Sequence, residues 1–327
     1  MRHKILQLLK DRKPRHVSGE EMAKLLHVSR TAIWKNINAL QAEGYDIEGS
    51  PRLGYRLFGI PDLLYPAEIT SGLQNKIIAS TPALVHYFKQ LESTNNALKK
   101  MADEGAPEGT VVVAEEQTRG KGRLGRFWIS PPGKGIWLSI LLKPQIAPQE
   151  TPLFTLLAAV AVVKAIKNVL PETPAGIKWP NDILLHRRKI CGILTELKAE
   201  ADLLHYLTIG IGINVNLTTE DFPPDLKDIA TSLYLENGQK KVPRLLLARN
   251  VLQEMDKIYE RYGTNGPSFI IAEWKKYNLT LGKKVTVKTA LESFPGTAVD
   301  LGQDGALIVE NEDKEKRHFY AGEVSLR

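Results

Sequence analysis

The sequence predicts an α+β protein in three parts: an N-terminal winged helix-turn-helix, a central α/β domain on a mixed sheet, and a small C-terminal β-barrel. Two helix starts and a hairpin pattern occupy residues 1–62. Strand-like and helix-like segments alternate over residues 63–278, and short strands follow one another over residues 279–327. A chain of 327 residues is long enough for these three domains.

Composition excludes several classes of protein. The chain is 43% hydrophobic and 25% charged, which suits a folded core and argues against general disorder. The single cysteine, Cys191, excludes a disulfide scaffold and is expected to be a small buried hydrophobe. The apolar run Thr151–Val163 has 13 residues, short of the ~20 that a membrane-spanning helix needs, and is expected to be a core helix. Charges interrupt the N-terminal segment where a signal peptide would be apolar, so we expect a cytoplasmic protein with no membrane partner.

Positive charge is concentrated at the N-terminal end. Residues 1–60 contain eleven Lys and Arg against six Asp and Glu, which accounts for most of the net charge of +7. A concentrated basic end suggests an anionic partner, nucleic acid first, although a solvated surface has the same composition.

Residues 17–40 contain two helix starts separated by a turn at His27 and Val28. Ser18 with Glu21 three residues later forms a predicted capping box, and Ser29 is the predicted cap of a second helix. This spacing is typical of a helix-turn-helix, whose second helix enters the major groove of DNA. The residues expected to face the core are Met22, Leu25 and Leu26 in the first helix and Ile33, Ile37 and Leu40 in the second.

The early outward residues of the second helix are the candidate DNA contacts: Arg30, Thr31, Lys35 and Asn38. Two alternating stretches around a Gly-Ser-Pro turn follow Gly44 and predict a hairpin wing, with Arg52 at its tip within reach of phosphate. The alternative is a small helical domain that binds protein.

The central region predicts a mixed sheet because several strands follow one another with short turns, unlike a doubly wound parallel sheet. The expected strands are Gly109–Ala114, Gly135–Leu142, Ile183–Leu185, Lys189–Leu197 and Leu207–Leu217. The expected helices are Asn95–Glu104, Pro152–Leu170 and Arg244–Tyr262.

The segment Gln117–Trp128 is the chemical focus of the chain. Four cations (Arg119, Lys121, Arg123, Arg126) alternate with three glycines (Gly120, Gly122, Gly125). Glycine lets a backbone approach a ligand closely, and Arg and Lys neutralise phosphate. The segment lacks a Walker A pattern and a dinucleotide-binding fingerprint. We therefore expect a phosphate-handling loop that becomes ordered on binding; the alternative is a disordered surface loop.

A second cluster, Lys178-Trp-Pro-Asn-Asp182, precedes Lys189. Pro180 interrupts a strand, so Asn181 and Asp182 are expected in a turn or bulge that faces a cavity. Lys189 opens an apolar strand, and a partly buried lysine there needs an anionic or carbonyl partner, unless it is a charge that protects a sheet edge. In a third segment, Ile209–Asn216, Gly210 and Gly212 clear one face of a strand either for a ligand or for packing.

Together these motifs resemble the biotin protein ligases and, given the N-terminal winged helix, the bifunctional bacterial ligases that also repress the biotin operon. The resemblance covers essentially the whole chain. It is carried by Ser93-Thr94-Asn95, Gly120–Arg126 with Trp128, Lys178–Asp182, Lys189 before Gly192, Gly210–Asn214 and Gly322–Arg327.

The resemblance implies roles for residues at these positions. The implied biotin-binding residues are Ser93, Thr94, Asn95, Gln117, Lys121, Gly122, Arg123 and Lys189, and the implied ATP-binding residues are Gly120, Arg126, Asn181, Asp182, Asn214 and Arg327. Arg123, Lys189 and Asp182 are the implied catalytic residues, with Asp182 orienting or deprotonating the acceptor lysine. Lys121 stands where the family often has arginine, and lysine lacks the planar fork of a bidentate contact.

The implied reaction forms biotinyl-AMP from biotin and ATP, with Mg²⁺ carried by the triphosphate and no metal site of the protein's own. Biotin then passes to a lysine of a carboxylase's biotin carboxyl carrier domain. The resemblance also implies a homodimer, promoted by the adenylate, that binds operator DNA.

Two alternative functions remain open at this stage. A lipoate ligase shares the fold class and the adenylate chemistry, and a ligand-responsive repressor keeps the fold only as a sensor.

The C-terminal part is expected to contain four short strands: Lys284–Val287, Gly296–Asp300, Ala306–Val309 and Arg317–Tyr320. The resemblance implies an SH3-like domain that places Arg327 near the nucleotide, and the alternative is a cap that serves stability alone.

Overall fold

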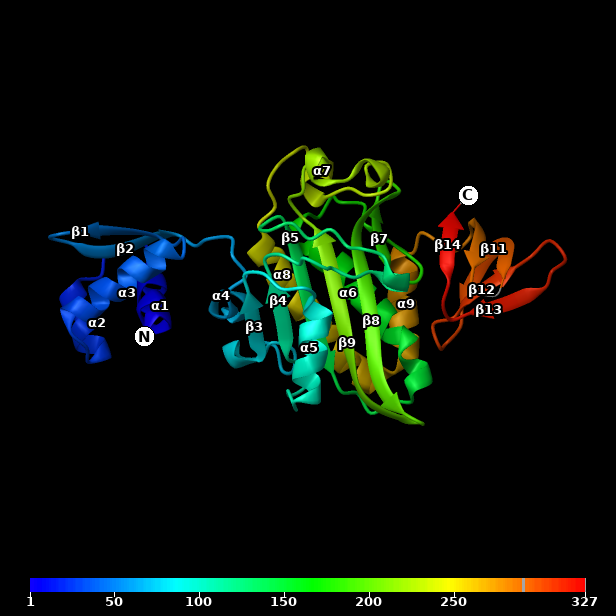
Figure 1. Cartoon of the computed structure of the whole chain (residues 1–327), viewed down its shortest axis with the longest axis horizontal. Coiled ribbons are helices and arrows are strands. Elements are labelled where there is room, and N and C mark those ends of the chain that lie inside the picture. The colour runs from blue at the N-terminus through cyan, green and yellow to red at the C-terminus, as the bar shows by residue number, and fades with distance from the viewer. Residues whose placement is uncertain (290–291, 327) are drawn as a thin grey trace. The chain divides into compact units, whose positions relative to one another are not determined.

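The computed structural model describes residues 1–289 and 292–326, and the chain divides into two compact units, Met1–Leu63 and Leu64–Arg327 (Figure 1). The Arg327 prediction lies outside the described residues.

The first unit has the predicted winged helix-turn-helix. Its elements are α1 (Arg2–Asp11), α2 (Gly19–Leu26), α3 (Arg30–Ala42) and the antiparallel hairpin of β1 (Asp46–Ser50) and β2 (Gly54–Gly59). Ser18 Oγ accepts the Glu21 N–H at 3.0 Å and Ser29 Oγ accepts the Ala32 N–H at 3.1 Å, so both caps are confirmed.

Two details of this unit differ from expectation. Leu25 is 51% exposed, because the short α2 turns Met22 and Ala23 into the core and leaves Leu25 at the edge of that face. The Glu21 carboxylate lies 3.7 Å from Arg12 Nη2, where a complete capping box would return it to the Ser18 backbone. Ile33, Ile37 and Leu40 are buried as predicted.

The second unit is built on a seven-stranded mixed sheet, as predicted. Its strands are β3 (Val85–Phe88), β4 (Val111–Ala114), β5 (Gly135–Leu142), β6 (Gly176–Lys178), β7 (Asp182–Leu185), β8 (Arg188–Glu200) and β9 (Leu203–Asn214). The spatial order is β3-β4-β5-β9-β8-β7-β6, with β3 and β4 parallel and the other neighbours antiparallel.

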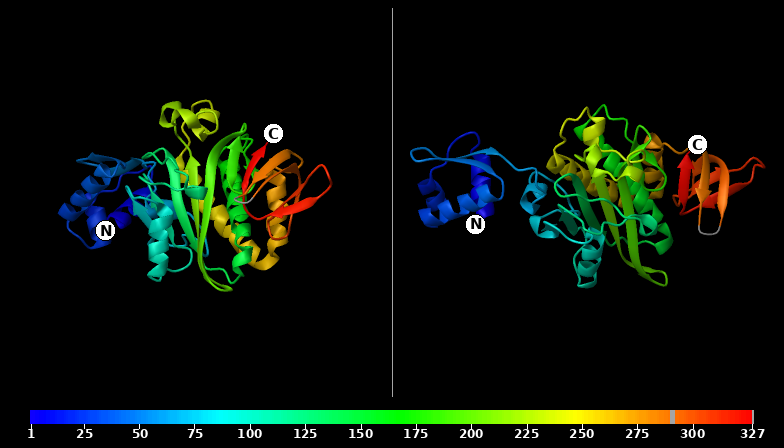
Figure 2. Two further views of the ribbon diagram at one scale, coloured as in Figure 1. Left: turned by 45° about the vertical axis from the view of Figure 1, so that its right-hand side comes forward. Right: turned by 45° about the horizontal axis from the view of Figure 1, so that its top comes forward.

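Helices cover both faces of this sheet (Figures 1 and 2). On one face, Ile136, Leu138 and Ile140 of β5 join a core with α6 (Pro152–Val169), α8 (Arg244–Asn265) and α9 (Pro267–Tyr277). On the other face, Leu141 packs with Leu98 of α5 (Thr94–Asp103). The short helices α4 (Pro66–Thr70) and α7 (Leu233–Glu236) complete the unit. Because neighbouring β5 side chains alternate between the two cores, α5 begins on the face opposite α6.

The apolar run lies in α6, where twelve side chains are buried in this core. By length and composition alone the segment Pro148–Val169 qualifies as a candidate membrane span, and two thirds of its best window is buried inside the protein. That burial agrees with the core helix expected from the sequence.

The C-terminal part is a five-stranded antiparallel sheet, the small all-β domain that was predicted. Its strands are β10 (Lys284–Lys288), β11 (Ser293–Leu301), β12 (Leu307–Glu310), β13 (Lys316–Phe319) and β14 (Glu323–Leu326), in the order β13-β12-β11-β10-β14. It is joined to the central sheet through the Trp179 Nε1–H, which donates to Gly305 O at 3.1 Å. Strand β14, which the sequence did not predict, brings Glu323 to the central domain's pocket.

The β8–β9 hairpin differs from prediction at both ends. The two strands extend to Glu200 and Leu203, beyond the apolar run, because the hydrogen-bonded ladder continues through polar residues at an exposed hairpin end. At the other end β9 stops at Asn214, and the chain leaves the sheet before the expected Leu217.

Candidate active site

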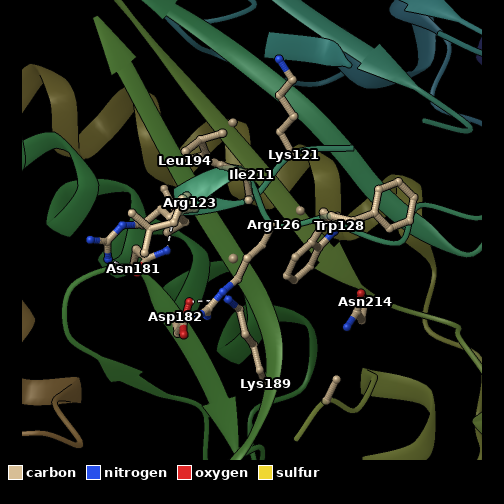
Figure 3. A pocket seen from close by; sticks show the side chains of 18 of the residues that line it. Lys121, Arg123, Arg126, Trp128, Asn181, Asp182, Lys189, Leu194, Ile211 and Asn214 are labelled. Carbon is tan, nitrogen blue, oxygen red and sulfur yellow. Dashed lines mark hydrogen bonds and ion pairs between the residues drawn. The ribbon is translucent and has the colours of Figure 1, made fainter. Parts of the chain in front are cut away.

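A cavity of about 580 Å³ lies in the second unit, where α5, the glycine-rich basic loop and strands β7, β8 and β9 meet (Figure 3). Twelve residues predicted from the sequence line it: Ser93, Thr94, Asn95, Gln117, Lys121, Gly122, Arg123, Arg126, Asn181, Asp182, Lys189 and Asn214. Residues as far apart in the sequence as Ser93 and Asn214 therefore converge on one site. Gly120 does not line the cavity; its O accepts from Trp128 N at 2.9 Å, and a Cβ on it would lie 2.4 Å from Trp128 O.

A buried hydrogen-bond network forms one wall of the cavity. Gln117 Oε1 accepts from the Thr94 N–H at 2.8 Å and from the Thr94 hydroxyl at 3.1 Å, so its acceptor capacity is used. Gln117 Nε2 donates to Ser130 Oγ at 2.9 Å and keeps a second N–H. This wall offers a ligand a donor, so it suits a ligand group that accepts hydrogen bonds.

Asn95 is held by the protein on all sides. Its Nδ2 donates to Glu196 Oε2 at 2.8 Å and to Leu194 O at 3.2 Å, and its Oδ1 accepts from Ser139 Oγ at 2.5 Å. A Cβ on Gly210 would lie 2.5 Å from Asn95 Oδ1. Glycine is needed at 210 because the Asn95 amide occupies the space of a side chain.

The Trp128 indole packs against Gly212 of β9 and Gly192 of β8, where the sheet has no side chains. A Cβ on Gly212 would lie 2.5 Å from Trp128 Nε1, and one on Gly192 would lie 2.9 Å from the same indole. The alternating glycines on β9 therefore make room for protein side chains that themselves line the cavity. Of the two interpretations that the sequence left open, packing accounts for both glycines.

Cations and carboxylates meet in another part of the cavity lining. Lys189 Nζ lies 2.5 Å from Asp182 Oδ1, the anionic partner that the sequence required, and 5.2 Å from the centre of the Trp128 ring. Arg126 pairs with Glu323 of β14. In Figure 3, Lys189, Asp182 and Arg126 converge at this side of the cavity, whereas Lys121 points away from them. The Lys121 amine donates instead to Asn96 Oδ1 at 3.3 Å.

Burial changes the pKa of two further cations in the cavity lining. It lowers the pKa of Lys178, against the attraction of Asp182, and it also lowers the pKa of Arg123. Arg123 Nη1 donates to Asn181 Oδ1 at 3.0 Å, and Asn181 Nδ2 donates to Ile193 O at 3.0 Å. Asn181 lies in the turn between β6 and β7, as predicted, and it positions the Arg123 guanidinium over the cavity.

Some contributors were not identified from the sequence. Ser139 and Glu196 hold Asn95 through hydrogen bonds, and Leu226 and Ile229 line the cavity from a segment given no role. Glu323 also lines the cavity; its segment was singled out, but Glu323 itself was given no role. Ser139 could have been identified from the sequence, since it is the one polar side chain within the apolar run Gly135–Leu142. Cys191 is fully buried and its thiol pKa is raised by desolvation, which confirms it as a packing residue.

The first unit presents its predicted DNA contacts to solvent. Arg30, Thr31, Lys35 and Asn38 of α3 are exposed, and so is Arg52 between β1 and β2. Trp34, which was not predicted as a DNA contact, is 54% exposed on the same helix, one turn after Arg30.

The model of the biotin/lipoate A/B protein ligase family matches residues 87–214, an HTH-domain model matches residues 2–56, and the model of the biotin protein ligase C-terminal domain matches residues 280–327. The bifunctional ligase/repressor BirA of Bacillus subtilis (strain 168) is 40% identical over 326 residues, covering 100% of this chain and 98% of that protein. BirA of Escherichia coli (strain K12) is 28% identical over 312 residues, covering 95% and 92%.

Among solved structures, the biotin protein ligase of Aquifex aeolicus in complex with biotin and ATP aligns with a TM-score of 0.64 and 30% identity, covering 74% of this chain and 98% of that one. The fold and the pocket thus define a protein ligase of the biotin and lipoate class joined to a helix-turn-helix domain. Within that class, the chain belongs to the family of bifunctional biotin ligase/repressors.

Proposed function

We propose that this protein joins biotin to AMP in the cavity described above, transfers biotin to a lysine of a carboxylase carrier domain, and represses biotin genes from an operator. The observation that carries the proposal is the pairing, in one cavity, of a hydrogen-bond-donating wall with a cluster of cations. We assign the donating wall to the biotin ring and the cations to phosphate.

The donating wall favours biotin over lipoate. The remaining Gln117 N–H can donate a hydrogen bond to a ligand oxygen, and the ureido carbonyl of biotin provides such an acceptor. The dithiolane of lipoate has no oxygen at that end, so this buried Gln117 N–H would be left unpaired, which costs about 1–3 kcal/mol. Ser93, Thr94 and Asn95 place this wall at the start of α5.

Adenylation in this site needs charge stabilisation and no protein nucleophile. A biotin carboxylate oxygen attacks the α-phosphorus of ATP, the bond to the bridging oxygen breaks, and pyrophosphate leaves with the electron pair. Lys189, Arg123 and Arg126 would neutralise the phosphates, with Mg²⁺ arriving on the triphosphate. Within the described residues, no group of three His, Cys, Asp or Glu side chains is arranged to hold a metal ion.

In the transfer step, the neutral amine of the acceptor lysine attacks the carbonyl carbon of biotinyl-AMP, and AMP leaves. Asp182 is our candidate for orienting that amine or taking its proton. Its Oδ1 is occupied by Lys189 in the free protein, so this role requires Lys189 to shift its contact to the adenylate.

The basic loop is our candidate for a lid over the adenylate. Leu124 and Phe127 are 77% and 62% exposed, and Leu124 has a φ of 56°, a backbone conformation unusual for a branched side chain. A mixed anhydride reacts with water, so closure of Lys121–Arg126 over it would protect the intermediate.

A homodimer is proposed to form along β8. Residues Leu194–Glu200 pair with β9 on one side, whereas among the described strands β7 covers the other side only up to Gly192. Leu197 on this part of β8 is 45% exposed, and Leu203, which follows at the hairpin end of β9, is 59% exposed. A free strand edge flanked by apolar side chains suits pairing with a second copy or with the acceptor domain. We place this chemistry in the cytoplasm, where carboxylases and operator DNA are accessible.

The first test is pyrophosphate release on mixing the protein with MgATP and either biotin or lipoate, without acceptor. We expect a burst with biotin alone. Silence with both ligands would favour a sensor without ligase activity, and a burst with lipoate would overturn the substrate assignment. Transfer of biotin to an acceptor lysine then separates the enzyme from the sensor-only repressor.

The regulatory half has its own test. Selection from a random DNA pool first supplies a bound sequence. Binding to that DNA should tighten when biotin and ATP are both added, because a ligand that favours the dimer also favours operator binding. Unchanged affinity at saturating biotin and ATP would refute this coupling.

A further inference from the structure

We propose that Glu196 is a positioning residue of the biotin site, acting through Asn95; this inference rests on the proposed ligase function. Glu196 lies on β8 and does not line the cavity. Its two carboxylate oxygens reach α5, the helix whose first turn forms the donating wall.

The contacts span two successive turns of α5. Glu196 Oε2 accepts from Asn95 Nδ2 at 2.8 Å, and Glu196 Oε1 lies 2.8 Å from Lys99 Nζ. Asn95 and Lys99 are four residues apart and share one helix face. A single carboxylate therefore links two successive turns at the start of α5 to β8.

The carboxylate also fixes which way the Asn95 amide points. Glu196 and Leu194 O both accept hydrogen bonds, so the NH₂ group must face them and Oδ1 must face Ser139. Ser139 Oγ is also 2.8 Å from Thr94 Oγ1, which donates to Gln117. A flipped or displaced Asn95 would thus disturb the network that presents the Gln117 N–H to the ligand.

The surroundings of Glu196 favour its ionised form. Burial opposes ionisation, but hydrogen bonds from Lys99 and Asn95 hold the pKa of Glu196 below its ordinary value. An ionised acceptor makes shorter and stronger hydrogen bonds than a neutral one. The consequence is an acceptor for Asn95 that stays ionised at neutral pH.

The test is a comparison of Michaelis constants in biotin-dependent pyrophosphate release. Glu196→Ala should raise the KM for biotin on the order of tenfold, as expected for loss of a hydrogen bond to a charged group, and leave the KM for ATP near the wild-type value. Glu196→Gln keeps an acceptor for Asn95 and should have a smaller effect. It also remains measurable if the alanine variant folds poorly.

The chain offers a matched control in Asp103, which joins the same two elements. Asp103 of α5 pairs with Lys198 of β8 at 2.8 Å but has no contact with Asn95 among the described interactions. Asp103→Ala removes this ion pair and the acceptor of the Tyr206 hydroxyl, 3.0 Å away, but leaves the hydrogen bonds of Asn95 in place. We expect it to leave the KM for biotin unchanged, which separates positioning of Asn95 from general attachment of the helix.

Three results would overturn the proposal: an unchanged KM for biotin in Glu196→Ala, equal increases in both KM values, or the same increase in Asp103→Ala. In an Asn95→Ala background, Glu196→Ala should add little, because its route to the site has been removed. Inactive wild-type protein would instead count against the proposed function, so the two failures are distinguishable.

Discussion

Replacement of Lys189 by alanine is the sharpest test of the chemistry assigned to the cavity. Lys189 Nζ lies 2.5 Å from Asp182 Oδ1, and the two side chains are 30% and 21% exposed. At this partial burial the ion pair contributes about 1 kcal/mol to stability, which corresponds to a shift of roughly 1–2 °C in Tm for a chain of this size. Lys189→Ala should therefore fold.

The effect on adenylation should be far larger. Removing one preorganised donor from developing charge typically costs about 10²–10³ in rate, or ~3–4 kcal/mol. We expect kcat/KM for biotin-dependent pyrophosphate release to fall by that factor. Lys189→Arg, which keeps the charge, should lose less. Lys241→Ala, at an exposed lysine outside the cavity, is the matched control and should behave like wild type.

A double variant distinguishes a catalytic role of Lys189 from a role in neutralising the charge of Asp182. If Lys189 served only to balance Asp182, then Asp182→Asn would restore activity to Lys189→Ala. Restored activity, or a Lys189→Ala enzyme with wild-type adenylate yield, would refute the catalytic assignment.

Three further predictions follow from contacts elsewhere. Gly210→Ala would bring a methyl group to 2.5 Å from Asn95 Oδ1, so we expect a loss of ~1–3 kcal/mol in unfolding free energy and a raised KM for biotin, measured by urea titration and kinetics. Removal of residues 1–62 should abolish DNA binding in a gel-shift assay while pyrophosphate release persists. Glu273 is mostly buried, which opposes ionisation, but Lys164 at 2.5 Å holds the pKa of Glu273 below 4.5. Glu273→Gln should therefore lower the free energy of unfolding by about 1–2 kcal/mol at pH 7. This difference between wild type and variant should shrink as pH falls below about 4.5, because Glu273 becomes protonated.

Each of these predictions has a contrary outcome. Gly263→Ala, at a helical glycine with open space beside it, should not destabilise the protein, and equal effects at 210 and 263 would contradict the contact argument. DNA binding by the truncated chain would place the DNA contacts in the second unit. A difference at Glu273 that persists unchanged at pH 3 would show that packing, and not the ion pair, stabilises α9 on α6.

Local signals made much of the fold predictable. Ser18 and Ser29 cap helices through contacts three residues away, so the two helix starts could be read from adjacent residues. Leu25 was misplaced because a two-turn helix buries too narrow a stripe for periodicity to define. Strand β14 was missed because its residues, Glu323–Leu326, become a strand only by pairing with β10.

The site divides in the same way. Gln117–Trp128 was identifiable because cations alternating with glycines are unusual chemistry within one segment. Glu196 was not, because its partners lie about 100 residues away on α5 and depend on how that helix crosses the sheet. The Lys189 partner was predictable in kind only. A register shift between Ile183 and Leu184 brings Lys189 to Asp182, and a bulge of that kind has no clear sequence signal.

Charge in the cavity links the two chemical steps. Among the described lining residues, six are cationic (Lys121, Arg123, Arg126, Lys178, Arg187, Lys189) and two are anionic, Asp182 and Glu323. Such an excess suits the several negative charges of ATP and the biotin carboxylate. Once pyrophosphate leaves, the remaining adenylate carries a single negative charge, so the cavity is left with positive charge that is no longer balanced. That field disfavours an incoming ammonium and favours the neutral amine, which is the form of lysine that can attack the adenylate. Cations that assist the first step thus also help to select the nucleophile for the second.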